Sequence, residues 1–131
     1  YQVKETTFKP LPFQQPRIPI WVAGTWPNKG PFRRAARFDG VYPLADNKGM
    51  PTLITPQGVS EVVANIASQR PDMDGYEVSA AIVLTGDPGE DRQRVAAFED
   101  AGVTWAHIGP ANEGESFDEV AQRVAAGPPR S

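Results

Sequence analysis

The chain has 131 residues, a net charge of −3 and no cysteine, and apolar residues make up 40% of it. This length suits one compact domain with a modest core rather than two domains. The lack of cysteine excludes disulfides, thiolate metal sites and cysteine nucleophiles, and it is typical of a reducing compartment, so we expect a cytoplasmic protein. The first residue is Tyr1 rather than Met, which indicates a chain that was processed or cut from a longer one.

The distribution of residues argues against two classes of partner. No run approaches the roughly 18 apolar residues of a membrane helix, and no signal peptide is present. Acidic and basic residues alternate along most of the chain, and the one basic excess is Arg33, Arg34 and Arg37, with Lys29 nearby. A nucleic-acid partner usually needs a broader basic face. We therefore expect neither a membrane nor a nucleic acid as a partner.

The first 17 residues and the rest of the chain differ in pattern. Residues 1–17 have no lasting period and contain three prolines, which predicts an extended arm. Residues 18–131 are expected to form the folded domain. Within it, the apolar run Ile18 to Ala23 predicts a buried strand that ends at residues 24–25. A helix from about Pro31 to Phe38 follows, because proline suits a first helical position.

The second unit begins with Val41 to Leu44, which predicts a short strand, and residues 45–51 are expected to form a polar loop. Thr55 and Pro56 then fit the N-cap and first position of a helix. Tyr76 to Thr85 predicts the third strand.

The last two helices carry clear end signals. Residues 86–88 (Gly-Asp-Pro) open the third helix, and Gly102 fits a left-handed C-cap after it. Val103 to Ile108 predicts the fourth strand. Residues 116–119 have the S-x-x-E form of a capping box, and the helix that follows is expected to end at Gly127.

The order is thus strand then helix, four times over. Such alternation predicts an α/β fold with a parallel sheet and right-handed crossovers. Two architectures satisfy it, an open four-stranded sheet or part of a closed barrel. An eight-unit (β/α)8 barrel takes about 250 residues, so four units in this chain match half of one.

Two blocks of sequence resemble one known family. Residues 16–24 (PRIPIWVAG) follow the pattern P-x-I-P-I-W-V-x-G, and residues 34–37 (RAAR) with residues 39–43 (DGVYP) follow R-A-A-R and D-G-x-x-P. The closing segment, residues 98–105 (FEDAGVTW), also matches. Together they resemble the C-terminal half of the luciferase-like flavin-dependent oxidoreductases, the family of bacterial luciferase.

This resemblance implies a fold, a cofactor and a reaction class. The fold would be four βα units forming the C-terminal half of a TIM-like (β/α)8 barrel. The cofactor would be FMN or the deazaflavin F420, and the substrate a small organic molecule that is oxidised, hydroxylated with O2, or reduced by hydride. The family's first four strands are not in this chain, so we expect it to be inactive alone, and either to form a homo-oligomer or to need the missing N-terminal half.

The candidate cofactor site lies after the first expected strand. Catalytic groups of barrel enzymes lie at the carboxyl ends of the strands. Gly24 would let the backbone approach a ligand, Thr25 offers a hydroxyl, and Trp26 could wall a flat ring. The helix start at Pro31 would supply amides for a phosphate. By the resemblance, this loop contacts the ribityl-phosphate end of the flavin. Arg33 is a further candidate for the phosphate, because it is the arginine nearest the helix start. The candidate cofactor-binding residues are therefore Ala23, Gly24, Thr25, Trp26 and Arg33. A plain βα turn is the alternative.

Other chemistry-bearing residues favour packing or remain open. His107 is the only histidine, so a two-histidine metal site is excluded, and it could face the pocket or pack at the sheet end. No G-x-S-x-G motif is present. Trp21 and Trp105 lie within strands and are expected to pack in the core or between layers of side chains. No catalytic residue can be assigned.

Two competing classes of function remain beside the oxidoreductase fragment. One is a non-catalytic α/β module that binds a phosphorylated ligand at its strand ends. The other is a fragment that serves only in dimerisation or folding.

Overall fold

The computed structural model describes residues 4–5, 7, 9–10, 13–109 and 114–127. The elements of this part of the chain follow one another in the order expected from the sequence, with one short strand added. They are β1 (Trp21–Trp26), α1 (Lys29–Ala35), β2 (Gly40–Asn47), β3 (Met50–Thr52), α2 (Pro56–Ala67), β4 (Glu77–Ile82), α3 (Pro88–Asp100), β5 (Trp105–Ile108) and α4 (Phe117–Ala126).

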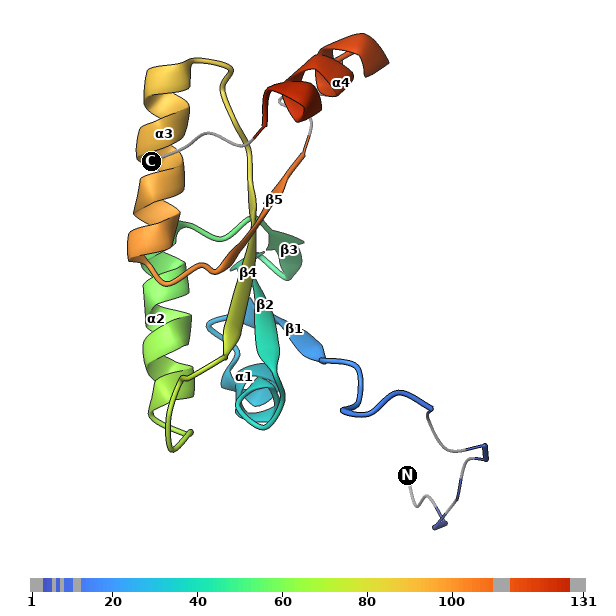
Figure 1. The fold of residues 1–131 in the computed structure, drawn as a ribbon. Coiled ribbons are helices and arrows are strands. Elements are labelled where there is room, and N and C mark those ends of the chain that lie inside the picture. The colour runs from blue at the N-terminus through green and yellow to red at the C-terminus, as the bar shows by residue number, and fades with distance from the viewer. Residues whose placement is uncertain (1–3, 6, 8, 11–12, 110–113, 128–131) are drawn as a thin grey trace.

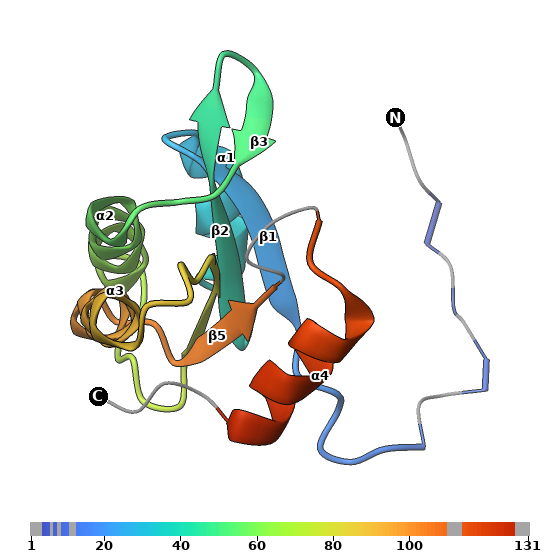
Figure 2. The same cartoon turned by 90° about the horizontal axis from the view of Figure 1, so that it is seen from above.

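The sheet is parallel and its strands stand in chain order. Its order is β1-β2-β4-β5, and β3 is attached antiparallel to β2. Figures 1 and 2 show α2 and α3 side by side on one face of the sheet. Phe32 and Ala35 of α1 belong to the same core as buried residues of α2, so α1 covers that face too. The α/β class predicted from the alternation is therefore confirmed.

The fourth helix is placed differently. Both views show α4 beyond the end of β5, on the opposite side of the strands from α2 and α3 (Figures 1 and 2). No residue of α4 is buried. The fourth βα unit thus has its strand in the sheet but lacks a helix packed on it.

The predicted boundaries of the first unit were wrong. The strand was expected over residues 18–23 but spans Trp21–Trp26, where each residue pairs with β2 in the register Trp21↔Gly40 to Trp26↔Ala45. Residues 18–20 precede that ladder, and Pro19 has no N–H to donate to one. The helix starts at Lys29 rather than Pro31, because the Asn28 side chain caps it by accepting from the Gly30 N–H at 3.2 Å.

The polar loop expected over residues 45–51 is instead a β-hairpin. Asn47 pairs with Met50, and the two residues between them, Lys48 and Gly49, have φ angles of 52° and 87°. Positive φ at both central residues is the geometry of the two-residue hairpin turn whose twist matches the flanking strands. Asp46 supports the turn, since its carboxylate accepts from the Gly49 N–H at 2.9 Å.

The N-terminal helix signals of the other units are confirmed. Thr55, Asp87 and Ser116 each accept a backbone N–H of the following helix, and Ser116 with Glu119 forms the predicted capping box. Gly102 follows α3 with a φ of 101°, as expected for a left-handed C-cap.

The carboxylate of Asp39 contacts the end of the arm. The described residues before β1 form no helix or strand. Asp39 Oδ2 accepts from Arg17 Nη1 at 2.6 Å and from the Ile20 N–H at 2.7 Å. The hydrogen bond from Arg17, with that from Ile20, holds the pKa of the Asp39 carboxyl below its ordinary value. In the described part of the chain, no helix is long and apolar enough to cross a membrane.

Candidate functional site

The sheet has one face covered by helices and one that we call the open face. Successive side chains of a strand point to opposite faces. The buried side chains of β2 and β4, such as Val41, Val78 and Ala80, belong to the core beneath the helices. Their neighbours along the strands therefore point to the open face. Tyr42, Glu77 and Ser79 are such neighbours. On the edge strands, Trp21 precedes Val22, which packs against the core, and Trp105 and His107 flank Ala106, which lies on the helix side, so these three also point to the open face. We call the six residues the open-face cluster: Trp21, Tyr42, Glu77, Ser79, Trp105 and His107.

A carboxylate joins the two tryptophans of the cluster. Glu77 Oε2 accepts from Trp21 Nε1 at 2.6 Å, and Glu77 Oε1 accepts from Trp105 Nε1 at 3.1 Å. The two indole rings contact each other, with centroids 5.9 Å apart. Trp21 and Trp105 lie on the two edge strands, so these contacts connect the whole width of the sheet.

Gly40 makes this arrangement possible. It lies between Trp21 and Glu77 in the register. A Cβ at residue 40 would lie 2.6 Å from Trp21 Cδ1 and 2.6 Å from the backbone oxygen of Glu77. The indole of Trp21 therefore lies across β2 directly over Gly40, and only glycine leaves room for it.

The histidine belongs to the same cluster. His107 Nε2 and Ser79 Oγ are 2.5 Å apart, and the direction of this hydrogen bond depends on the tautomer of the ring. The imidazole meets the rings of Tyr42 and Trp21 edge to face, with centroids at 5.6 and 6.3 Å. Ser79 is fully buried, so its hydroxyl is not accessible to a substrate and does not serve as a nucleophile in this arrangement.

The position of the cluster along the strands is informative. Trp21, Glu77 and Trp105 are the first residues of β1, β4 and β5. They lie at the amino end of the sheet, whereas ligands of parallel α/β sheets bind at the carboxyl ends. At this end, hydrogen-bonded aromatic residues are better explained by packing than by catalysis. The expected core position of Trp21 and Trp105 was wrong, because neither belongs to the core beneath the helices and Trp105 is 53% exposed.

Gly24 and Trp26, two of the predicted cofactor residues, point toward the helices. A Cβ at residue 24 would lie 2.5 Å from Pro31 Cβ, so the absence of a side chain at Gly24 allows α1 to pack closely on β1. The Trp26 ring packs edge to face on Phe32 at 5.5 Å. Trp26 Nε1 donates to Glu61 Oε2 at 2.8 Å. Both residues lie in the second half of β1 rather than in the expected loop. Both pack against residues of α1 or α2 and so do not face a ligand.

The other three predicted residues are not brought together. Ala23 and Thr25 alternate with Gly24 and Trp26 and so point to the open face near the carboxyl end of β1. Arg33 is exposed on α1, on the other side of the sheet. The five residues therefore do not form a single pocket, and only Ala23 and Thr25 share a surface.

The helix starts offer few groups for a phosphate. At the start of α1, the Asn28 side chain accepts a hydrogen bond from the Gly30 N–H, and Pro31 has no backbone N–H to donate. At the start of α3, Asp87 takes the amides of Gly89 and Glu90. Asp91 accepts from the backbone N–H groups of Thr85 and Gly86. Burial opposes ionisation of Asp91, but these hydrogen bonds still hold its pKa below the ordinary value, so the side chain is a carboxylate whose charge repels a phosphate at this helix start.

Sequence reasoning missed the role of Glu77. Residues 76–85 were predicted only as a strand, without a role for its polar residues, yet Glu77 and Ser79 stand two residues apart and so share a face. That spacing of polar residues within an apolar strand was the available signal. Among the described residues, no group of three or more acidic or histidine side chains is placed to hold a metal ion.

Comparisons of the chain with protein-family models, with curated proteins and with solved structures gave no match. The resemblance noted above therefore rests on the sequence blocks that carry it.

Proposed function

We propose that this chain is the C-terminal half of a TIM-like (β/α)8 barrel, and that its open face is one wall of the barrel interior. The order of the strands and the placement of the helices support this. Its four parallel strands stand in chain order, and α1, α2 and α3 all pack on one face. An open doubly wound sheet would reverse its strand order and carry helices on both faces.

The open-face cluster is the observation that carries the proposal. Three strand spacings of about 4.8 Å separate the edge strands of a flat four-stranded sheet. Even so, Trp21 and Trp105 meet above the strands between them. Side chains that converge in this way are typical of the concave face of a barrel, where layers of side chains fill the interior. Trp105 is 53% exposed, so a further layer of side chains has room to pack on it.

We propose further that the complete barrel is a luciferase-like oxidoreductase that uses FMN or F420 on a small organic substrate. The supporting residues are those of the two sequence blocks, 16–24 and 33–43. When bound, the flavin supplies the hydride or oxygen chemistry. On this chain, Ala23 and Thr25 are suited to contact its ring from the open face. The residues present do not fit its phosphate at Gly24, because Pro31 fills the space beside that glycine.

The proposal predicts that residues 1–131 alone catalyse no flavin-dependent turnover. Barrel active sites are built from loops after several strands, so half of the strands supply half of the walls. The assay is oxidation of NADPH or reduced F420 with added FMN or F420, with free cofactor as the blank. Turnover above that blank would contradict the proposal. Placed after four further βα units, the same residues should form an enzyme weakened by Thr25→Tyr but not by Arg33→Ala.

A further inference from the structure

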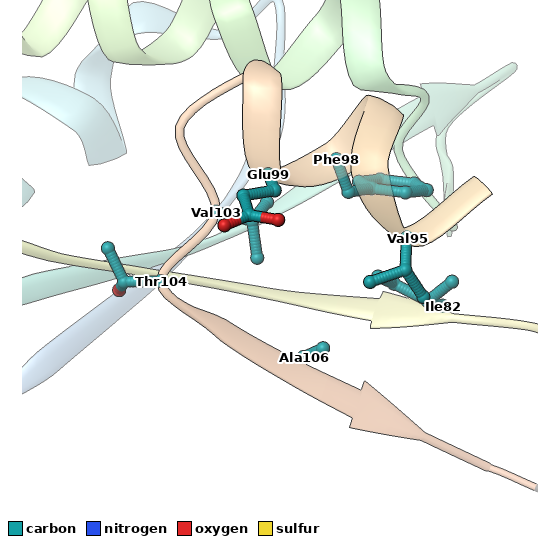
Figure 3. A pocket seen from close by; sticks show the side chains of 7 residues that line it. All are labelled: Ile82, Val95, Phe98, Glu99, Val103, Thr104 and Ala106. Carbon is teal, nitrogen blue, oxygen red and sulfur yellow. The ribbon is translucent and has the colours of Figure 1, made fainter. Parts of the chain in front are cut away.

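Phe98 of α3 lines two open cavities. Figure 3 shows the smaller one, about 190 Å³, which lies between α3 and β5 and carries the carboxylate of Glu99. The larger one, about 310 Å³, is lined by residues 53–56 before and at the start of α2, by the end of β4 and by α3. Among the described residues that line this larger cavity, Arg94 alone is charged, so we call it the Arg94 cavity.

The Arg94 cavity lies where β2 and β4 have separated. The two strands pair only at Gly40↔Glu77 and Val41↔Val78, although β2 continues to Asn47 and β4 to Ile82. Residues 53–56 and Val83, which follows β4, line the cavity beyond this short contact. Its walls therefore come from this chain, and no further βα unit is needed to form them.

The walls of the Arg94 cavity are mostly apolar and partly exposed. Ile54 and Phe98 belong to the core beneath the helices, whereas Leu53 is 45% exposed and Val83 is 37% exposed. A ligand that covers such side chains removes apolar surface from water. The volume is at the lower end of the roughly 300–1,000 Å³ of small-molecule sites, so the cavity suits a small ligand.

A hydrogen bond holds the Arg94 guanidinium at the cavity. Arg94 Nη1 donates to the Val83 backbone oxygen at 2.9 Å, which uses one of the five N–H groups of a guanidinium. Arg94 forms no ion pair with any residue that the structure describes. Asp91, one turn earlier, does not line the cavity, and its carboxylate accepts from the amides of Thr85 and Gly86. The positive charge of Arg94 is therefore available to an anion.

We propose that the Arg94 cavity binds a small carboxylate that carries an apolar group about the size of a phenyl ring. The carboxylate pairs with Arg94, because the N–H groups of a guanidinium match the two oxygens of a carboxylate. The apolar group covers Leu53 and Val83 and reaches Phe98. A single cation in the lining favours one carboxylate over a doubly charged phosphate. The site uses the core side of the sheet and is independent of the flavin proposed for the open face.

The probe is 3-phenylpropionate, titrated into the full chain and followed by saturation-transfer difference NMR. Its matched control is 3-phenylpropanamide, which has the same shape without the charge. We expect a dissociation constant on the order of 1 mM for the carboxylate, in keeping with so small a ligand. The amide should bind at least about ten times more weakly. Equal affinity for the two compounds, or no saturable signal from the carboxylate below about 10 mM, would overturn the proposal.

Two variants on α3 locate the charge. Arg94→Gln should weaken 3-phenylpropionate at least about tenfold and remove its advantage over the amide. Arg92→Gln is the matched control, because Arg92 is exposed on the same helix and does not line the cavity, and it should change the affinity by less than about twofold. Circular dichroism checks that both variants fold. Equal weakening by both would show attraction to the net charge alone and would overturn the proposal.

A third variant tests the apolar part of the cavity. Ala97 lines it and is exposed, so Ala97→Leu adds a side chain there without disturbing the core. It should weaken 3-phenylpropionate and 3-phenylpropanamide by the same factor, because it fills the space of the phenyl ring. Unchanged affinity for both compounds would place the ring outside the cavity and would overturn the proposal.

Discussion

Replacing Gly40 with alanine should destabilise the protein by about 2–4 kcal/mol, because the new methyl group has no space. Its carbon would lie 2.6 Å from the Glu77 backbone oxygen and 2.6 Å from Trp21 Cδ1. The backbone of β4 is fixed by the sheet, so the indole of Trp21 must move away. Overpacking of this kind costs about 1–3 kcal/mol. The displaced indole also loses its 2.6 Å hydrogen bond to Glu77. A hydrogen bond to a charged group contributes about 1.5–3 kcal/mol, part of which water replaces.

The assay is urea unfolding followed by circular dichroism and by tryptophan fluorescence at low protein concentration. Gly109→Ala is the matched control, because a Cβ there would meet nothing within 4 Å. It should change the stability by less than about 0.5 kcal/mol. Adding Trp21→Ala to Gly40→Ala should cost less than the sum of the two single changes, since the clash with the indole is gone. If Gly40→Ala is as stable as Gly109→Ala, the indole does not lie over residue 40 and the open-face cluster is wrongly described.

Three further predictions concern packing, pH and association. Gly24→Val should lower the free energy of unfolding by about 1–3 kcal/mol in urea, because its Cβ would lie 2.5 Å from Pro31 Cβ. The control Thr25→Val, on the open face, should be nearly neutral. An unchanged urea midpoint for Gly24→Val would mean that α1 does not pack closely on β1 there. The lowered pKa of Asp39 stabilises the fold above the unfolded-state value of about 3.9, and this contribution is lost as the pH falls through the lower folded-state value. Asp39→Asn should therefore flatten the loss of stability below about pH 4, and an identical pH profile would refute the role of the Arg17 pair. Because β1 and β5 each leave one strand edge unpaired, the isolated chain should self-associate in sedimentation velocity, and a monomer with one sharp unfolding transition would contradict this.

The features that the sequence predicted well are local. Thr55, Asp87 and Ser116 cap helices through their own side chains, and Gly102 follows α3 with positive φ, so a few neighbouring residues determine each of these ends. The alternation of apolar runs was likewise sufficient for the α/β class.

The features that were missed depend on partners distant in sequence. The start of β1 is set by its pairing with Gly40, nineteen residues later, and the apolar run alone placed it three residues too early. Gly24 follows a strand as a ligand-binding glycine would, but the contact that explains it is with Pro31. The open-face cluster joins residues on all four parallel strands, so no local pattern could assemble it. The hairpin at Lys48 and Gly49 was detectable in principle, because glycine at the second turn position is a known signal.

The most direct test of the half-barrel is amide hydrogen exchange at the two edge strands, β1 (Trp21–Trp26) and β5 (Trp105–Ile108). Exchange is compared between the isolated chain and a protein in which four further βα units precede it. Closure of a barrel pairs both edges, so exchange at β1 and β5 should slow together, by at least about tenfold. An open sheet that is merely extended from its N-terminal side would protect β1 and leave β5 unchanged. Protection of β1 without protection of β5 would contradict the barrel.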